Sequence, residues 1–87
     1  PNYVMCKAKV SLSEGMNVDS ILKKVEKKYS EKNPSTMDGI KIAFKSSWVH
    51  LRKSNTEPII RVYTEAKNET KANELSQRFL REIEEMV

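Results

Sequence analysis

The sequence is short of most of the residues that carry recognisable chemistry. Its 87 residues include one cysteine, Cys6, which excludes an internal disulfide and a metal site built from several cysteines. The one histidine, His50, belongs to no Ser/His/Asp or Cys/His arrangement, and no metal-ligand spacing occurs. No run approaches the roughly 20 apolar residues that a membrane-spanning helix needs. These absences exclude a disulfide-stabilised module, a multi-cysteine metal site and a helical membrane protein.

What remains is the composition of a small globular protein. Charged residues make up 32% of the sequence and hydrophobic residues 38%, which is neither a disordered nor a fibrous composition. We expect one domain over residues 1–87, with a narrow margin of stability. Because Pro1 is not an initiating residue, we expect this domain to come from a longer or processed chain. The first residues show no apolar signal-peptide core, so we expect a cytoplasmic protein that binds no membrane.

The hydrophobic residues recur with periods that predict the element order β-α-β-β-β-α. Residues 3–10 alternate as in a strand, and helical spacing follows from Val18 to Tyr29, with Asn17 as the N-cap and Asn33-Pro34-Ser35 as the end. The remaining apolar positions predict three more strands and a second helix. The strands are marked by Ile40, Ile42 and Phe44, by Val49 and Leu51, and by Ile60, Val62, Thr64 and Ala66. The helix begins near Asn68 and buries Ala72, Leu75, Phe79, Ile83 and Met86.

Two helices with one apolar stripe each and four strands with one apolar face each predict a two-layer α+β fold. We expect a largely antiparallel four-stranded sheet with both helices on one face. Cys6 falls on the apolar face of the first strand, so we expect it to be a buried small hydrophobe.

The most informative segment joins the third and fourth expected strands. It runs Arg52-Lys53-Ser54-Asn55-Thr56-Glu57-Pro58 and crowds a guanidinium, two hydroxyls and a carboxamide together. A guanidinium binds a phosphate dianion through two parallel hydrogen bonds, and short polar side chains and turn amides satisfy its other oxygens. Pro58 fixes the exit of the loop and disfavours a helical conformation at Glu57. The segment is therefore a candidate anion site.

Together with its neighbours, this segment resembles the C-terminal domain of the α-D-phosphohexomutases, a family of phosphomannomutases, phosphoglucomutases and phosphoglucosamine mutases. The resemblance is carried by Asp38-Gly39-Ile40-Lys41-Ile42 and by the run from Trp48 to Ala66, which includes Arg-x-Ser-Asn-Thr-Glu-Pro. It implies a TATA-box-binding-protein-like fold. It also implies a phosphate-binding loop whose contacts with the substrate come from Arg52, Ser54, Asn55 and Thr56.

The resemblance further implies that residues 1–87 are the C-terminal phosphate-binding domain of an enzyme that interconverts hexose 1-phosphate and hexose 6-phosphate. In that reaction a phosphoserine donates its phosphoryl group, a bisphosphorylated sugar forms and reorients, and Mg²⁺ assists at the serine. The serine, the metal loop and the sugar-reading loop belong to other domains of the family. We therefore expect this chain alone to contain no catalytic residue, to bind no metal and to be inactive. The sequence does not decide between mannose, glucose and glucosamine.

Two further residues are candidates for supporting the loop. The carboxylate of Glu57 would repel a phosphate, so we expect it to accept loop amide hydrogen bonds or to pair with an arginine. If Val49 and Leu51 face the core, Arg52 lies on the opposite face of the sheet, where Arg61 of the next strand stands near it. Arg61 then either completes a two-arginine anion site or pairs with a carboxylate across the strands.

The net charge of +4 keeps two other functions open. Lysines on the exposed side of the first helix suit a nucleic-acid-binding protein: Lys23, Lys24, Lys27, Lys28 and Lys32. Against this, Glu26 and Glu31 interrupt the lysines, and the strands lack the paired exposed aromatics that stack bases. A module for protein interaction or oligomerisation is the other alternative. Our expectation is a sugar phosphate and the other domains of the parent enzyme as partners, and no nucleic acid.

Overall fold

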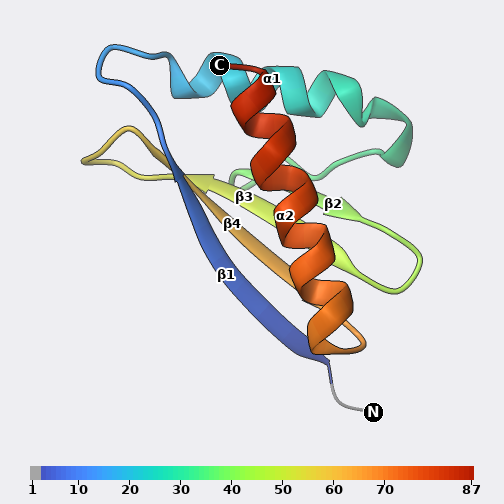
Figure 1. The fold of residues 1–87 in the computed structure, drawn as a ribbon. Helices are drawn as coiled ribbons and strands as arrows, with labels where there is room; N and C mark the ends of the chain where they lie inside the picture. Colours follow the sequence, from blue (N-terminus) through green and yellow to red (C-terminus); the bar gives the residue numbers. More distant parts are fainter. Residues whose placement is uncertain (1–2) are drawn as a thin grey trace.

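The structure is a computed structural model that describes residues 3–87 (Figure 1). Four strands and two α-helices follow one another in the order β-α-β-β-β-α, and a short 3₁₀ turn, Ser30–Lys32, comes after the first helix. The elements are β1 (Val4–Ser11), α1 (Val18–Lys28), β2 (Ile40–Ala43), β3 (Trp48–Lys53), β4 (Ile59–Ala66) and α2 (Glu69–Glu85). The predicted α+β class is confirmed.

The strands form one antiparallel sheet in the order β1-β4-β3-β2. The last strand in the sequence therefore lies between the first and the third. Both helices cover the same face of the sheet, with α2 across β1 and β4 and α1 against β3 (Figure 1). In the described part of the chain the opposite face carries no helix, so the side chains that point away from the core are open to solvent or to a partner.

The core lies between the helices and the inner face of the sheet. Every second side chain of the central strands is inaccessible to solvent there, as at Leu51 and Val62. Phe79 and Ile83 of α2 are equally buried and pack onto this face. The predicted assignment of inward-facing and outward-facing positions is confirmed along β2, β3 and β4.

An asparagine caps each helix at its first turn. Asn17 Oδ1 accepts a hydrogen bond from Ser20 N at 3.0 Å, and Asn68 Oδ1 accepts one from Lys71 N at 2.8 Å. An N-cap of this kind satisfies one of the backbone donors that the first turn leaves without a partner. The predicted cap of the first helix and the predicted start of the second are confirmed.

Some details differ from the sequence predictions. Phe44, predicted in the second strand, lies just after β2 and is half-buried. Cys6 is only half-buried, because β1 is an edge strand of the sheet. Met86 is half-buried, because it follows the last residue of α2. α1 ends at Lys28 rather than at Asn33, since Tyr29 leaves the helical conformation (φ −107°, ψ 24°) and starts the 3₁₀ turn.

A hydrogen-bonded cluster fixes the end of α1 on α2. Tyr29 OH donates to Glu82 Oε1 at 2.6 Å, while Arg78 donates through Nη2 to Tyr29 OH at 3.0 Å and through Nε to Glu82 Oε2 at 3.1 Å. Lys28 Nζ lies 3.1 Å from the same carboxylate. Burial by itself raises the pKa of Glu82, but the hydrogen bonds from Tyr29, Lys28 and Arg78 outweigh burial and lower it.

Candidate anion site

The loop between β3 and β4 is closed at its base by backbone hydrogen bonds. Ser54 N donates to Ile59 O at 3.1 Å, and Ile59 N donates to Glu57 O at 2.8 Å. Pro58 contributes its carbonyl oxygen, which accepts from Leu12 N at 2.7 Å just after β1 ends. The loop is therefore held at both strand ends, and its tip projects from one end of the sheet.

The short polar side chains gather at the tip of this loop. Ser54 Oγ lies 3.5 Å from Thr56 Oγ1 and accepts a hydrogen bond from Thr56 N at 3.3 Å. Ser54 is half-buried, whereas Asn55 and Thr56 are exposed. Two hydroxyls and a carboxamide thus present donors and acceptors to solvent from a fixed turn, as the coordination of an anion requires.

Arg52 stands at the end of β3, directly before the loop, and its partner is Asp38. Arg52 Nη2 lies 3.4 Å from Asp38 Oδ2, and both side chains are largely exposed. Gly39 makes this approach possible: its φ is 71°, and a Cβ atom at this position would collide with the carbonyl oxygen of Leu51. His50 Nε2 hydrogen-bonds to the carbonyl oxygen of Asp38, which fixes the same segment from a second side. The role of the Asp38-Gly39 turn in orienting Arg52 did not follow from the sequence pattern.

Three cations form a row across the open face of the sheet. Arg61 of β4 lies directly opposite Arg52 of β3 on one side and Lys9 of β1 on the other. Like charges directly opposite one another on neighbouring strands destabilise a sheet. Within residues 3–87 Arg61 forms no ion pair with a carboxylate. A two-arginine anion site stays a prediction.

Glu57 is not the partner of either arginine in the described residues. Its backbone carbonyl, rather than its carboxylate, takes part in closing the loop. The remaining cation of the segment, Lys53, is bound to Asp19 at the start of α1, with Nζ 3.0 Å from Oδ1. A supporting role for the Glu57 carboxylate stays a prediction.

A cavity of about 510 Å³ opens between the loop, the first turns of α1 and the Asp38 segment. Arg52, Lys53 and Asn55 line it from the loop side, and Asp19 and Lys23 line it from the helix side. This volume is within the range of small-molecule sites in proteins. The loop therefore lies beside a space of small-molecule size, whose lining also includes the carboxylates of Glu26 and Asp38.

Trp48, on the open face, is engaged within the sheet. Trp48 Nε1 donates to Glu65 Oε1 at 3.1 Å, and Lys41 Nζ lies 4.6 Å from the centre of the Trp48 ring. These contacts hold Trp48 at the edge of the open face.

Neither a metal centre nor a membrane span is found in residues 3–87. No three His, Cys, Asp or Glu side chains of this part of the chain come together in a group that could hold a metal ion. Neither α1 nor α2 combines the length and the hydrophobicity that crossing a membrane requires.

Known proteins are similar in sequence to this chain. The profile of the family described as phosphoglucomutase/phosphomannomutase, C-terminal domain, matches residues 6–82. A phosphoglucosamine/phosphogalactosamine mutase of Sulfurisphaera tokodaii is 47% identical over 77 residues, which cover 86% of this chain and 17% of that protein. A phosphoglucosamine mutase of Methanococcus vannielii is 37% identical over 78 residues, with the same two coverages. A phosphoglucomutase/phosphomannomutase of Thermococcus kodakarensis is 50% identical over 50 residues, 58% of this chain and 11% of that protein.

Proposed function

The chain belongs to the family of phosphoglucomutase/phosphomannomutase C-terminal domains, and we propose that it binds the phosphate group of a hexose phosphate within a longer enzyme. The relatives named above are sugar-phosphate mutases, and the chain spans only 17% of the length of the first two. In our proposal the longer enzyme interconverts hexose 1-phosphate and hexose 6-phosphate through a phosphoserine and a bisphosphorylated sugar. Residues 1–87 form its C-terminal phosphate-binding domain.

One observation carries the proposal: the guanidinium of Arg52 and the hydroxyls of Ser54 and Thr56 lie at the same end of the sheet, on a loop whose base is fixed. Asn55 extends the set at the exposed tip of the loop. Arg61 and Lys9 stand behind Arg52 and add positive potential on the open face.

The proposed work of this loop is positioning. Phosphoryl transfer depends on alignment and on stabilisation of charge, so an interaction with the phosphate that is not being transferred is useful. Binding energy gained there aligns the sugar hydroxyl for attack on the phosphoserine and favours closure of this domain over the substrate. Because the loop contacts phosphate oxygens, it serves either orientation of the bisphosphate and leaves the choice between mannose, glucose and glucosamine to other parts of the enzyme.

The family resemblance places the magnesium site in other domains of the enzyme, and the residues of this chain would not fit such a site. Mg²⁺ takes oxygen ligands in near-octahedral geometry, usually with one or more carboxylates, and residues 3–87 contain no suitable cluster. The described residues therefore contribute to the proposed reaction by binding and orienting phosphate. No step of the proposal passes through a metal ion held by this chain.

The proposal is tested by titrating the chain with inorganic phosphate and with glucosamine 6-phosphate while amide NMR shifts are followed. Binding on the order of millimolar, equivalent to about 4 kcal/mol, is expected because the loop is open to water. The largest shifts should occur at Ser54, Asn55 and Thr56. Arg52→Lys keeps the charge but loses the planar two-pronged donor, so it should weaken binding about tenfold.

Arg81→Lys is the matched control, since Arg81 is an exposed arginine of α2 that lies outside the loop. It should leave the affinity unchanged. Shifts that follow the lysines of α1 instead of the loop, or an Arg52→Lys variant that binds like the parent chain, would refute the proposal.

A further inference from the structure

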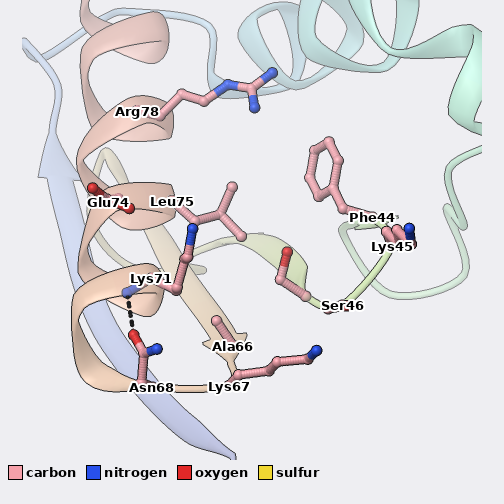
Figure 2. A pocket seen from close by; sticks show the side chains of 11 residues that line it. Phe44, Lys45, Ser46, Ala66, Lys67, Asn68, Lys71, Glu74, Leu75 and Arg78 are labelled. Atoms are coloured by element: carbon pink, nitrogen blue, oxygen red, sulfur yellow. Dashed lines mark hydrogen bonds between the residues drawn. The ribbon is translucent and has the colours of Figure 1, made fainter.

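A second concave site lies at the other end of β3 and β4, away from the phosphate loop. It is a pocket of about 540 Å³ between the turn that joins β2 to β3 and the N-terminal half of α2 (Figure 2). We call it the distal pocket and define it by Phe44, Ser46, Lys67, Lys71, Leu75 and Arg78. The eight residues of β4 separate it from the loop by about 25 Å, at roughly 3.3 Å per residue. It is therefore not an extension of the anion site described above.

The charge around the distal pocket is strongly positive. Lys45, Lys67, Lys71 and Arg78 line it, and Glu74 is the one carboxylate among its lining residues. Figure 2 shows Glu74 at the edge of α2 turned away from Phe44, while Lys67 and Arg78 extend toward the side on which Phe44 lies. Within residues 3–87 none of the three lysines forms an ion pair. An anion in this pocket would meet three lysines without ion-pair partners, and Arg78, which is paired with Glu82.

Arg78 is already oriented for such a contact. Its Nε donates to Glu82 and its Nη2 to Tyr29 OH, and its guanidinium carbon lies 5.4 Å from the centre of the Phe44 ring. Its Nη1 has no hydrogen-bond partner in the described part of the chain. A side chain that is held in place before binding loses little conformational entropy when it binds, which favours affinity.

The floor of the distal pocket is apolar. Phe44, Ala66 and Leu75 supply it, and Phe44 is half-buried. The cations and the apolar floor lie side by side within one volume of small-molecule size. Inorganic phosphate would contact only the cations, whereas an anion joined to an apolar ring would contact both the cations and the apolar floor.

We propose that the distal pocket binds a small organic anion in which a phosphate group is attached to an aromatic or apolar ring. The phosphate contacts Arg78, Lys71 and Lys67, and the ring packs on Phe44 and Leu75. This site does not depend on the function proposed for the loop.

The experiment is an amide NMR titration of the chain with phenyl phosphate, compared with inorganic phosphate. Phenyl phosphate should shift Ser46, Ser47 and Lys67 and bind there about fivefold more tightly than inorganic phosphate, because one ring contact contributes roughly that factor. The double variant Lys67→Gln/Lys71→Gln should weaken this binding about tenfold, since each removed charge contributes a few-fold. Arg78 is left unchanged because its variants would also disturb the Tyr29–Glu82 cluster.

The matched control is Lys24→Gln/Lys27→Gln, which removes the same charge from the exposed side of α1. It should leave phenyl phosphate binding at the distal pocket unchanged. The proposal is overturned if Ser46, Ser47 and Lys67 do not respond, if inorganic phosphate binds there equally well, or if the control weakens binding as much as the pocket variant. Shifts at Ser54 to Thr56 are read separately in the same spectra, so failure of the loop proposal is distinguishable from failure of this one.

Discussion

At the scale of single residues, the position of Arg52 depends on a glycine in another part of the sequence. Gly39 lets the segment before β2 pass against the backbone of β3, and Asp38 then reaches the guanidinium. The pair is exposed on both sides, so it contributes little to stability and its effect is mainly on orientation. An incoming phosphate meets a guanidinium that is held close to the loop but remains accessible.

The two glycines of the chain provide a matched test of this idea. Gly39 and Gly15 both have positive φ angles, 71° and 88°, but a Cβ at Gly15 would meet no atom within 4 Å. Gly15→Ala should therefore cost about 1 kcal/mol for its backbone conformation alone. Gly39→Ala adds a clash with the Leu51 carbonyl and a contact with Arg52 Cγ, and should cost about 2–4 kcal/mol in total. Urea unfolding of both variants measures the difference, and equal costs would contradict the close approach.

At the scale of secondary-structure elements, the periodicity of the sequence predicted the features that depend on neighbouring residues. The alternation of β3 and β4, the asparagine caps and the order of the elements all follow from neighbouring residues. The end of α1 was not predicted from neighbouring residues. Tyr29, at this end, is hydrogen-bonded to Glu82, a residue of α2 that lies far along the chain. The partner of Arg52 was missed for the same reason, since a contact between two segments separated in sequence leaves no periodic signal.

The pairing of β3 with β4 leads to a prediction about Arg61. This residue lies between Arg52 and Lys9 and has no ion-pair partner in residues 3–87, so its charge repels its neighbours when no anion is bound. Arg61→Gln should therefore stabilise the free chain by about 0.2–1 kcal/mol and at the same time weaken phosphate binding at the loop. Thermal melts with and without phosphate measure both effects. Arg81→Gln, outside the row, should change neither; a destabilised Arg61→Gln variant would show that Arg61 has a structural role.

The cluster between α1 and α2 gives the stability a dependence on pH. The pKa of Glu82 lies below its ordinary value of 4.5, because the hydrogen bonds from Tyr29, Lys28 and Arg78 outweigh burial. A carboxyl group with a lowered pKa in the folded state stabilises the fold above its unfolded pKa, and this contribution is lost as the pH falls through the folded value. The free energy of unfolding should therefore decline below about pH 4.5. Glu82→Gln should lower the free energy of unfolding by about 1.5–3 kcal/mol at neutral pH and make its decline in acid (the acid limb) less steep. Glu84→Gln, at an exposed position of α2, is the control, and an unchanged acid limb in Glu82→Gln would contradict the assignment.

At the scale of the whole molecule, cations lie at both ends and on the open face of the sheet, in addition to the lysines of α1. The loop carries Arg52 at one end, the distal pocket carries Lys67 and Arg78 at the other, and Arg61 lies on the open face between them. The relatives matched by this chain are about five times longer, since 77 aligned residues make up 17% of the first of them. In our proposal the rest of such an enzyme supplies the phosphoryl donor and the metal, and this domain supplies phosphate contacts.

This assignment of groups to different parts of the enzyme predicts that the 87-residue chain binds phosphate but does not turn over substrate. Residues 3–87 contain no cluster that could hold a metal ion, and the loop offers donors without a group placed to transfer a phosphoryl group. A coupled assay that follows conversion of hexose 1-phosphate to hexose 6-phosphate should therefore remain at background, with a full-length family member as the positive control. The loop amides of the same sample should still shift with phosphate, which shows that the chain is folded and competent to bind. Turnover that co-purifies with the chain and disappears in Arg52→Ala would mean that this domain contains catalytic groups that the proposal assigns to the rest of the enzyme.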